Sequence, residues 1–136
     1  MFDNFDNNVL EILEDSKKYT NKHFKLFKIG TESLLYVMFS KEESITRFLL
    51  EDYRVTLDEI SQATLSYVII RSNNNEYTDK FKEVIEMSKV ISKENNSDVV
   101  LEEHLLFALL VVKDTIFEAL IKTSSSRIVI FLSLTF

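Results

Sequence analysis

The residues of this chain that could do chemistry are carboxylates and two histidines. Glu103 and His104 are adjacent, and a metal site or an acid–base pair could be considered there. The H-E-x-x-H spacing of a zinc helix is absent, however, and the chain has only one other histidine, His23, and no cysteine. No nucleophile elbow and no glycine-built oxyanion loop accompanies the serines. The sequence therefore predicts no catalytic residues, no metal site and no cofactor, and it favours a packed, hydrogen-bonded role for His104.

The composition predicts the elements that must position these side chains. The chain has 136 residues, with no proline and one glycine, and leucine, isoleucine, glutamate and lysine are abundant. Little therefore interrupts a helical backbone, whereas a strand-rich fold of this length would need more turn residues. The length allows one sizeable hydrophobic core. We predict a single all-α domain.

The charge pattern excludes some partners. The formal net charge is −6, with acidic and basic residues interspersed, whereas phosphate backbones are bound by basic faces. The start of the chain lacks the regions of a secretory signal, and no apolar run approaches the ~20 residues that a membrane-spanning helix needs. We expect a cytoplasmic protein that binds neither nucleic acid nor membrane.

A short motif occurs twice and indicates a tandem duplication. Residues 29–35 read I-G-T-E-S-L-L, and residues 100–106, 71 positions later, read V-L-E-E-H-L-L. Each copy follows an amphipathic segment that opens on an aromatic residue, Phe5 in the first half and Tyr77 in the second. A repeat of this size is typical of a duplicated unit of several helices. We expect repeat one at about 2–70 and repeat two at about 77–122, which together form one domain over residues 1–122.

Hydrophobic spacing and capping residues predict the helices. Thr31 is expected to cap the second helix and Thr78 the fifth, while capping boxes at Ser40 and Thr56 are expected to open the third and fourth. Residues 73–75, all asparagine, are the expected linker between the repeats. The expected helices are Asp6 to about Tyr19, Glu32 to Phe39, the segments that start at Ser40, Thr56 and Thr78, Leu101 to Val112, and Asp114 to Ile121.

Most aromatic and aliphatic side chains lie at positions that predict a place in the core. Phe48 is one of them, and Leu65 is likewise expected to point inward. Phe24 and Phe27 are exceptions because they lie in the polar connection before the first motif. Exposed aromatic residues beside a groove would suit binding of an unfolded peptide or an adaptor, and core filling is the alternative.

The last residues depart from the repeat. A helix that matches the segment from Thr56 to Ile70 should follow Lys122, but the chain continues with a serine-rich stretch and the apolar, β-prone run from Ile128 to Leu132. We therefore treat residues 123–136 as an atypical apolar tail and the second repeat as incomplete. The tail could cover the core in place of the missing helix, or it could result from truncation or an altered reading frame. Both alternatives stay open.

The doubled motif resembles the N-terminal domain of Clp unfoldases, above all in the ClpC and ClpA branch. Besides the two motif copies, the resemblance rests on Tyr77-Thr78 with the helix that follows and on residues 49–60, and it covers about residues 2–121. It implies an all-α, pseudo-twofold tandem repeat of a four-helix unit. It also implies a non-catalytic module of an AAA+ chaperone that docks adaptor proteins and unfolded or tagged substrates for unfolding and degradation. The chain has no G-x-x-x-x-G-K-[ST] phosphate loop, and its single glycine cannot form one, so we expect no ATP hydrolysis here.

The resemblance also implies binding residues. In some ClpC proteins the motif glutamates, here Glu32 and Glu103, grip the guanidinium group of phosphoarginine, and a carboxylate can accept paired N–H donors from such a group. A helix N-terminus or a basic group would be needed for the phosphate. We assign partner binding to Glu32, Glu103, Thr31 and Thr78, together with Phe24 and Phe27. The alternative for each glutamate is an acid that stabilises the first turn of a core helix.

The chain also departs from the family pattern, which weakens the expectation of phosphoarginine binding. Asp6 stands at a helix start where the family usually has threonine, and its carboxylate would repel phosphate. Leu101 replaces the second motif glycine, Glu102 adds a negative charge beside the second motif glutamate, and Ser33 replaces the first motif histidine. Two other functions stay open, namely a free-standing truncated paralogue that acts as a regulator or decoy for Clp adaptors, and a decayed fragment.

Overall fold

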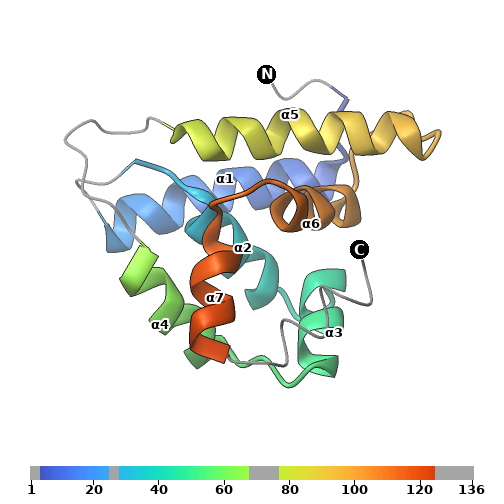
Figure 1. Ribbon diagram of the computed structural model, residues 1–136. Coiled ribbons are helices and arrows are strands. Elements are labelled where there is room, and N and C mark those ends of the chain that lie inside the picture. The colour runs from blue at the N-terminus through green and yellow to red at the C-terminus, as the bar shows by residue number, and fades with distance from the viewer. Residues whose placement is uncertain (1–3, 25–27, 68–76, 125–136) are drawn as a thin grey trace.

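The computed structural model describes residues 4–24, 28–67 and 77–124. These residues form seven α-helices and contain no strand, only two isolated β-bridges, which confirms the all-α prediction (Figure 1). No described helix is long and apolar enough to cross a membrane. The helices are α1 (Asn7–His23), α2 (Thr31–Ser40), α3 (Ile45–Asp52), α4 (Leu57–Tyr67), α5 (Asp79–Glu94), α6 (Glu102–Val111) and α7 (Ile116–Ser124).

Two of the predicted caps are confirmed. Thr78 precedes α5, and its Oγ1 accepts a hydrogen bond from the Phe81 N–H at 3.1 Å. At the start of α4, the Thr56 Oγ1 accepts from the Glu59 N–H at 3.2 Å while a Glu59 carboxylate oxygen accepts from the Thr56 N–H at 3.0 Å. This reciprocal pair is a capping box, which satisfies two N–H groups that have no partner within the helix.

Two other predicted caps are wrong. Ser40 does not open α3 but closes α2, because the buried apolar face of α2 continues up to that point; the cap of α3 is Ser44, whose Oγ accepts from the Arg47 N–H at 3.0 Å. Thr31 does not cap α2 either. It is the first helical residue, and the residue before it, Gly30, has no side chain to cap the helix with.

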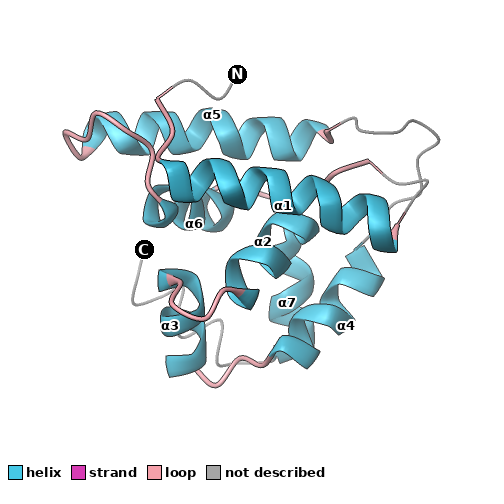
Figure 2. Cartoon of the chain, turned by 180° about the vertical axis from the view of Figure 1, so that it is seen from behind, coloured by secondary structure: helices cyan, strands magenta, loops and turns pink. Residues whose placement is uncertain are grey.

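The two repeats are tied together reciprocally. Phe5, just before α1, forms a parallel bridge with Val100, just before α6; Tyr77, just before α5, forms the equivalent bridge with Ile29, just before α2. Each motif segment is therefore attached to the start of the other repeat's first helix, which is the pseudo-twofold arrangement that the duplication predicts. Figures 1 and 2 show α1 and α5 along one side of the molecule, α2 and α6 beneath them, and α3, α4 and α7 beyond.

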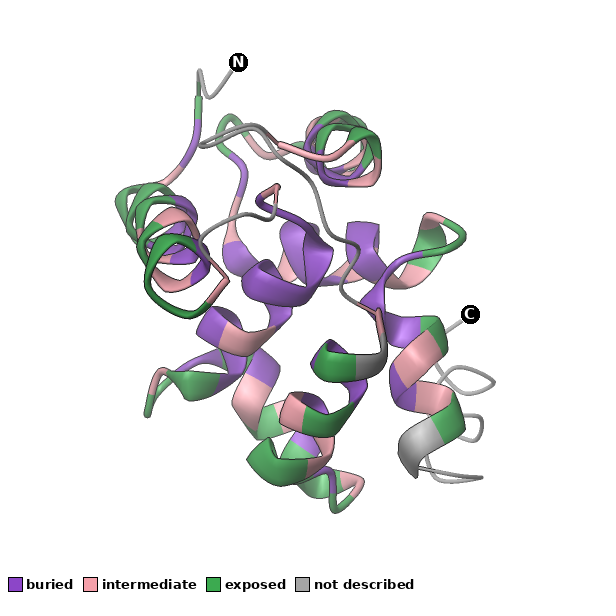
Figure 3. Ribbon diagram, turned by 90° about the vertical axis from the view of Figure 1, so that its left-hand side faces the viewer, coloured by how far each residue is buried: buried purple, intermediate pink, exposed green. Residues whose placement is uncertain are grey.

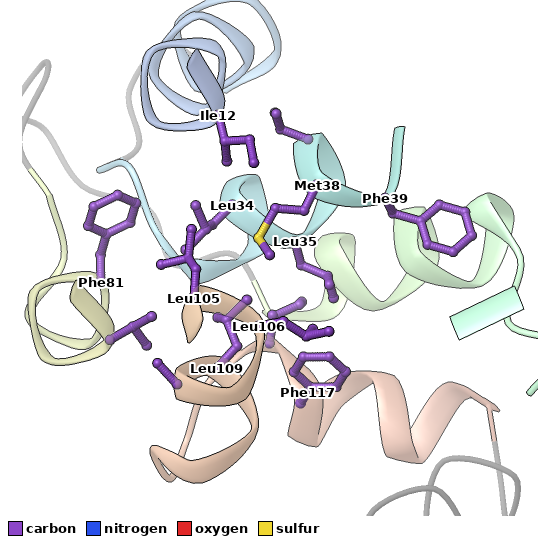
Figure 4. Packing of buried hydrophobic residues seen from close by; sticks show 14 of the residues in the cluster. Ile12, Leu34, Leu35, Met38, Phe39, Phe81, Leu105, Leu106, Leu109 and Phe117 are labelled. Atoms are coloured by element: carbon purple, nitrogen blue, oxygen red, sulfur yellow. The ribbon is translucent and has the colours of Figure 1, made fainter. Parts of the chain in front are cut away.

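The core lies around α2 and α6. Residues 31–39 of α2 are all buried except half-buried Tyr36, and α6 contributes the fully buried side chains of Leu105, Leu106 and Leu109. Burying each such leucine contributes about 1.5–3 kcal/mol. Helices α1, α5 and α7 cover these two with Ile12, Phe81 and Phe117, as Figure 4 shows, and exposed residues lie on the outer faces of the helices (Figure 3).

Phe48 and Leu65 were expected in the core but lie outside it. Phe48 is 72% exposed and Leu65 is 71% exposed. The buried residues of α3 are Thr46 and Leu50, and Ile60 and Ala63 are buried on α4, which packs on α7 and α2. At about 100° per residue, Phe48 and Leu65 project from other faces than these buried positions. Apolar spacing in a helix of eight or eleven residues was too short a pattern to identify the buried face.

The offset of 71 residues between the repeats also relates α3 to α7. Ser44 and Thr115, again 71 positions apart, precede α3 and α7, and each donates a side-chain hydrogen bond to a carbonyl of the helix before it. By the same register, a counterpart of α4 would begin at residue 128, outside the described residues. The expectations for the linker at 73–75, for Phe27 and for Ile128 to Leu132 likewise fall outside them, and the repeat boundaries stay predictions. Helix α7 itself extends to Ser124, two residues into the predicted tail.

Candidate functional site

The predicted binding residues that the structure describes lie in two places. In each place the N-termini of two helices meet. The first place, beside the Ile29–Tyr77 bridge, joins the start of α2 with the start of α5, so it holds Glu32, Thr31 and Thr78. The second, beside the Phe5–Val100 bridge, joins the start of α6 with the start of α1. It holds Glu103, and its counterpart of Thr78 is Asp6, whose carboxylate accepts from the Asn8 N–H at 3.1 Å and caps α1.

In the first place, the carboxylate of Glu32 is folded back onto its own helix. The side chain is 4% exposed, and its carboxylate takes hydrogen bonds from the backbone N–H groups of Gly30, Glu32 and Ser33 and from the Ser33 hydroxyl. It thus satisfies N–H groups at the start of α2 that the glycine cap leaves without a side-chain partner. The alternative interpretation of this glutamate, an acid that stabilises the first turn, describes what the carboxylate does in this structure.

Burial sets the protonation of this carboxyl group. Loss of contact with water raises the pKa of Glu32 to about 7, and the hydrogen bonds from the surrounding N–H groups and Ser33 only partly offset it. The pKa values of two nearby tyrosine hydroxyl groups are raised for the same reason. Burial raises the pKa of Tyr19 to about 12 and raises that of Tyr67, and in both cases the charge of Glu32 adds to the effect.

The inward turn of the Glu32 side chain depends on a glycine at position 30. A Cβ atom at this position would lie 2.2 Å from one carboxylate oxygen of Glu32 and 2.8 Å from the other. In the second motif Leu101 occupies the equivalent position with similar backbone angles, and its own Cβ blocks the same fold-back for Glu103. Glu103 is accordingly half-buried rather than buried. The single glycine therefore decides which motif glutamate is turned inward.

Glu102 has a structural role that the sequence did not indicate. It is 6% exposed, and its carboxylate accepts from the Thr46 N–H at 3.1 Å, in the first turn of α3, and from the Asn8 side-chain amide at 3.2 Å. The charge that we expected beside Glu103 is thus directed at the N-terminus of a helix in the other repeat, where a carboxylate is favoured.

Thr31 occupies the position in the first motif that Glu102 occupies in the second. It likewise caps a helix of the other repeat. Its Oγ1 accepts from the Ile116 N–H at 3.0 Å, at the start of α7, and donates to the Tyr67 hydroxyl at 3.2 Å. Tyr67 in turn donates to the Asp114 carbonyl at 2.9 Å. Each motif therefore caps the third helix of the opposite repeat, and Thr31 is fully buried in doing so.

The aromatic residues near the first place form a cluster around Tyr19. Its ring stacks on Tyr36 at a centroid distance of 4.3 Å, and it meets Phe24 edge to face at 5.9 Å. Phe24, at the end of α1, is half-buried, so it combines packing with partial exposure at the surface. Phe27, the other aromatic residue of the predicted site, lies outside the described residues.

His104 is a packed residue, as predicted. It is 6% exposed, and its Nδ1 accepts from the Leu101 N–H at 2.9 Å, which fixes the turn before α6. Within the described part of the chain, no group of three or more histidine, cysteine, aspartate or glutamate side chains could hold a metal ion.

Comparison with known proteins places the fold. No model of a known protein family and no curated protein sequence matches the chain. Among solved structures, it is similar to the N-terminal domain of the caseinolytic protease-associated chaperone ClpD from Arabidopsis thaliana, with a TM-score of 0.74, 19% identity and coverage of 99% of this chain and 98% of that one.

The N-domain of ClpV is similar as well. In a complex with a VipB peptide it gives a TM-score of 0.74 at 14% identity, covering 96% of this chain and 88% of that one. The N-domain of ClpV from Vibrio cholerae gives 0.72 at 14% identity, covering 96% and 86%. The fold that the doubled motif predicted is therefore confirmed: the chain has the fold of the Clp N-terminal domain.

Proposed function

We propose that this chain is a non-catalytic protein-binding module of a Clp-type AAA+ unfoldase, and that it docks adaptors or unfolded and tagged substrates for unfolding and degradation. The observation that carries the proposal is the fold, which matches over almost the whole chain a ClpV N-domain solved with a peptide. The absence of a phosphate loop from the sequence agrees with a recognition function and with ATP hydrolysis elsewhere. The cytoplasm remains the predicted compartment.

Within this function, we assign the contact with a partner's cationic group to Glu103. Glu103 is half-buried at the start of α6, whereas the carboxylate of Glu32 is turned onto the N–H groups of α2. Asp6 caps the neighbouring helix α1 in the same place, so the two carboxylates favour a cation over a phosphorylated group. Phosphoarginine is therefore a weaker candidate ligand than an unmodified arginine or lysine of a partner protein.

A binding assay tests the assignment. An adaptor protein of a Clp unfoldase, immobilised on a sensor, is expected to bind the chain, and Glu103→Gln is expected to weaken binding at least several-fold because a charge-assisted hydrogen bond is lost. Glu94→Gln, at the exposed end of α5, is the matched control for the loss of one negative charge. Equal binding by Glu103→Gln and the control would refute the site, and no binding of any Clp adaptor or unfolded substrate would refute the function.

A titration with free phosphoarginine separates the two ligand classes. We expect no saturable binding at millimolar concentration, measured by calorimetry. Saturable binding that Glu103→Gln abolishes would overturn our preference for an unmodified cation.

A further inference from the structure

An apolar groove lies between α5 and the C-terminal end of α6. It has a volume of about 610 Å³, and its apolar lining consists of Met87 and Val90 on α5 and Val112 just after α6. Val90 is 49% exposed, and the other two are half-buried. A hollow of this size can hold a few side chains, and methionine adapts its shape to different apolar partners.

In repeat one, the positions equivalent to the three apolar lining residues are polar. The counterparts of the three lining residues, by the offsets that relate the helix caps, are Asp15, Lys18 and Lys41. Lys41 and Val112 end α2 and α6 with nearly the same backbone angles, which confirms that they are equivalent. The Nζ of Lys41 lies 2.7 Å from Glu11 and 3.5 Å from Asp15, so an ion-paired contact closes this place between α1 and α2.

This comparison shows that the fold does not need apolar residues there. Repeat one packs its first two helices with salt bridges at the surface, while repeat two places three apolar side chains in an open hollow. Exposed apolar groups in an otherwise polar position are unfavourable in water unless something covers them. The apolar lining of this groove is therefore not a requirement of the helix pair.

The charges around the groove select the partner. Asp79, Glu83 and Glu86 line it together with a single base, Lys82. Glu83 and Glu86 are paired with neighbouring lysines at 3.2 and 2.9 Å, but exposed pairs of this kind contribute only about 0–1 kcal/mol and exchange readily for a partner's cation. Among the residues that line the groove three are acids and one is a base, and the whole chain has a formal net charge of −6, so a basic partner is favoured and an acidic one is opposed.

We propose that this groove docks a basic amphipathic segment of a partner protein. Two apolar side chains three or four positions apart on a helix would enter the hollow beside Met87, Val90 and Val112, and lysines or arginines next to them would face the acidic rim. The inference deepens the proposed protein-binding function and rests on it. The two fail separately, because substitution of Glu103 leaves the groove intact.

Exchange of residues between the repeats gives the test. The triple variant Met87→Asp, Val90→Lys, Val112→Lys introduces into repeat two the residues that repeat one tolerates at these positions, so it is expected to fold, which circular dichroism melting checks. The probe is a fluorescein-labelled helical peptide of leucine and lysine, titrated into the full chain by anisotropy. We expect the triple variant to bind at least tenfold more weakly, while Glu94→Gln, which changes the net charge by the same amount, binds as the wild type does.

The reverse exchange provides a gain of binding. Asp15→Met, Lys18→Val, Lys41→Val builds the apolar lining in repeat one, where Glu11 supplies an acid, and the number of peptides bound per chain is expected to rise from one to two. Unchanged affinity in a folded triple variant would overturn the proposal. So would equal binding of a peptide with serine in place of leucine, since net charge alone would then explain it. Self-association of the wild type that the triple variant abolishes would assign the groove to a second copy instead.

Discussion

The buried carboxyl group of Glu32 makes the stability of this domain dependent on pH. Its pKa is 4.5 in an unfolded chain and about 7 in the folded one, chiefly because burial disfavours the ionised form. Below pH 4.5 both states hold the proton, so the group does not alter stability. Between the two values the unfolded chain releases its proton while the folded chain keeps it, so stability falls as the pH rises. Above about pH 7 the loss is complete.

The size of the effect follows from the two pKa values. Each pKa unit corresponds to about 1.4 kcal/mol, so the ionised carboxylate lowers the free energy of unfolding by about 3 kcal/mol at pH 8. Glu32→Gln removes the titration and keeps the shape of the side chain and one oxygen acceptor for the backbone N–H groups. We expect the variant and the wild type to differ little at pH 4 and the variant to gain up to about 3 kcal/mol relative to the wild type at pH 8.

Urea denaturation followed by circular dichroism measures this difference at a series of pH values. Glu94→Gln, on the exposed end of α5, controls for the general effect of removing a negative charge. The reasoning is refuted if the difference between Glu32→Gln and the wild type is the same at pH 4 and pH 8. An NMR titration that finds the Glu32 carboxyl group with a pKa near 4.5 would refute it directly.

Three further predictions concern the packing that supports the site. Glu102→Ala removes the carboxylate that caps α3, and urea denaturation should show a loss of about 1–3 kcal/mol together with faster amide exchange in the first turn of α3. Thr31→Val leaves the buried N–H of Ile116 without its acceptor and should destabilise by about 1–3 kcal/mol, whereas Thr31→Ser should restore most of the loss; equal effects of the two would contradict the cap. Phe48→Ser should change stability by less than about 0.5 kcal/mol because the ring is 72% exposed, while Phe81→Ala in the core should lower it by about 3–5 kcal/mol, and similar effects would contradict the assigned burial.

The sequence predicted those parts of the structure that depend on local signals or on repetition. The capping box at Thr56 and the cap at Thr78 involve residues three positions apart, and the structure confirms both. The doubled motif predicted a pseudo-twofold helical fold, and the reciprocal bridges at Ile29 and Val100 show how the two halves are joined. The packed, hydrogen-bonded role of His104 was also predicted.

The sequence did not predict which distant groups the motif residues contact. Thr31 caps a helix 85 positions away, and Glu102 caps one 56 positions away. No local pattern indicates such a partner. The only indication in the sequence was the duplication itself. Thr31 and Glu102 occupy equivalent positions, each directly before its motif glutamate. That symmetry would have suggested matching long-range roles, although not the N–H groups that each residue meets. The exposure of Phe48 was missed because apolar spacing in an eight-residue helix fits more than one face.

The two motif copies have diverged, and the residues on which our two binding proposals rest lie on repeat two. In repeat one, the glycine lets Glu32 turn inward, and Lys41 closes the contact between the first two helices with ion pairs. In repeat two, Leu101 prevents the same inward turn, so Glu103 stays partly exposed, and the place equivalent to the ion pairs is an open apolar groove. Both of our binding proposals therefore fall on repeat two, although they were reached from different residues. If they hold, exchanges confined to repeat two should alter partner binding, and the matching exchanges in repeat one should mainly alter stability.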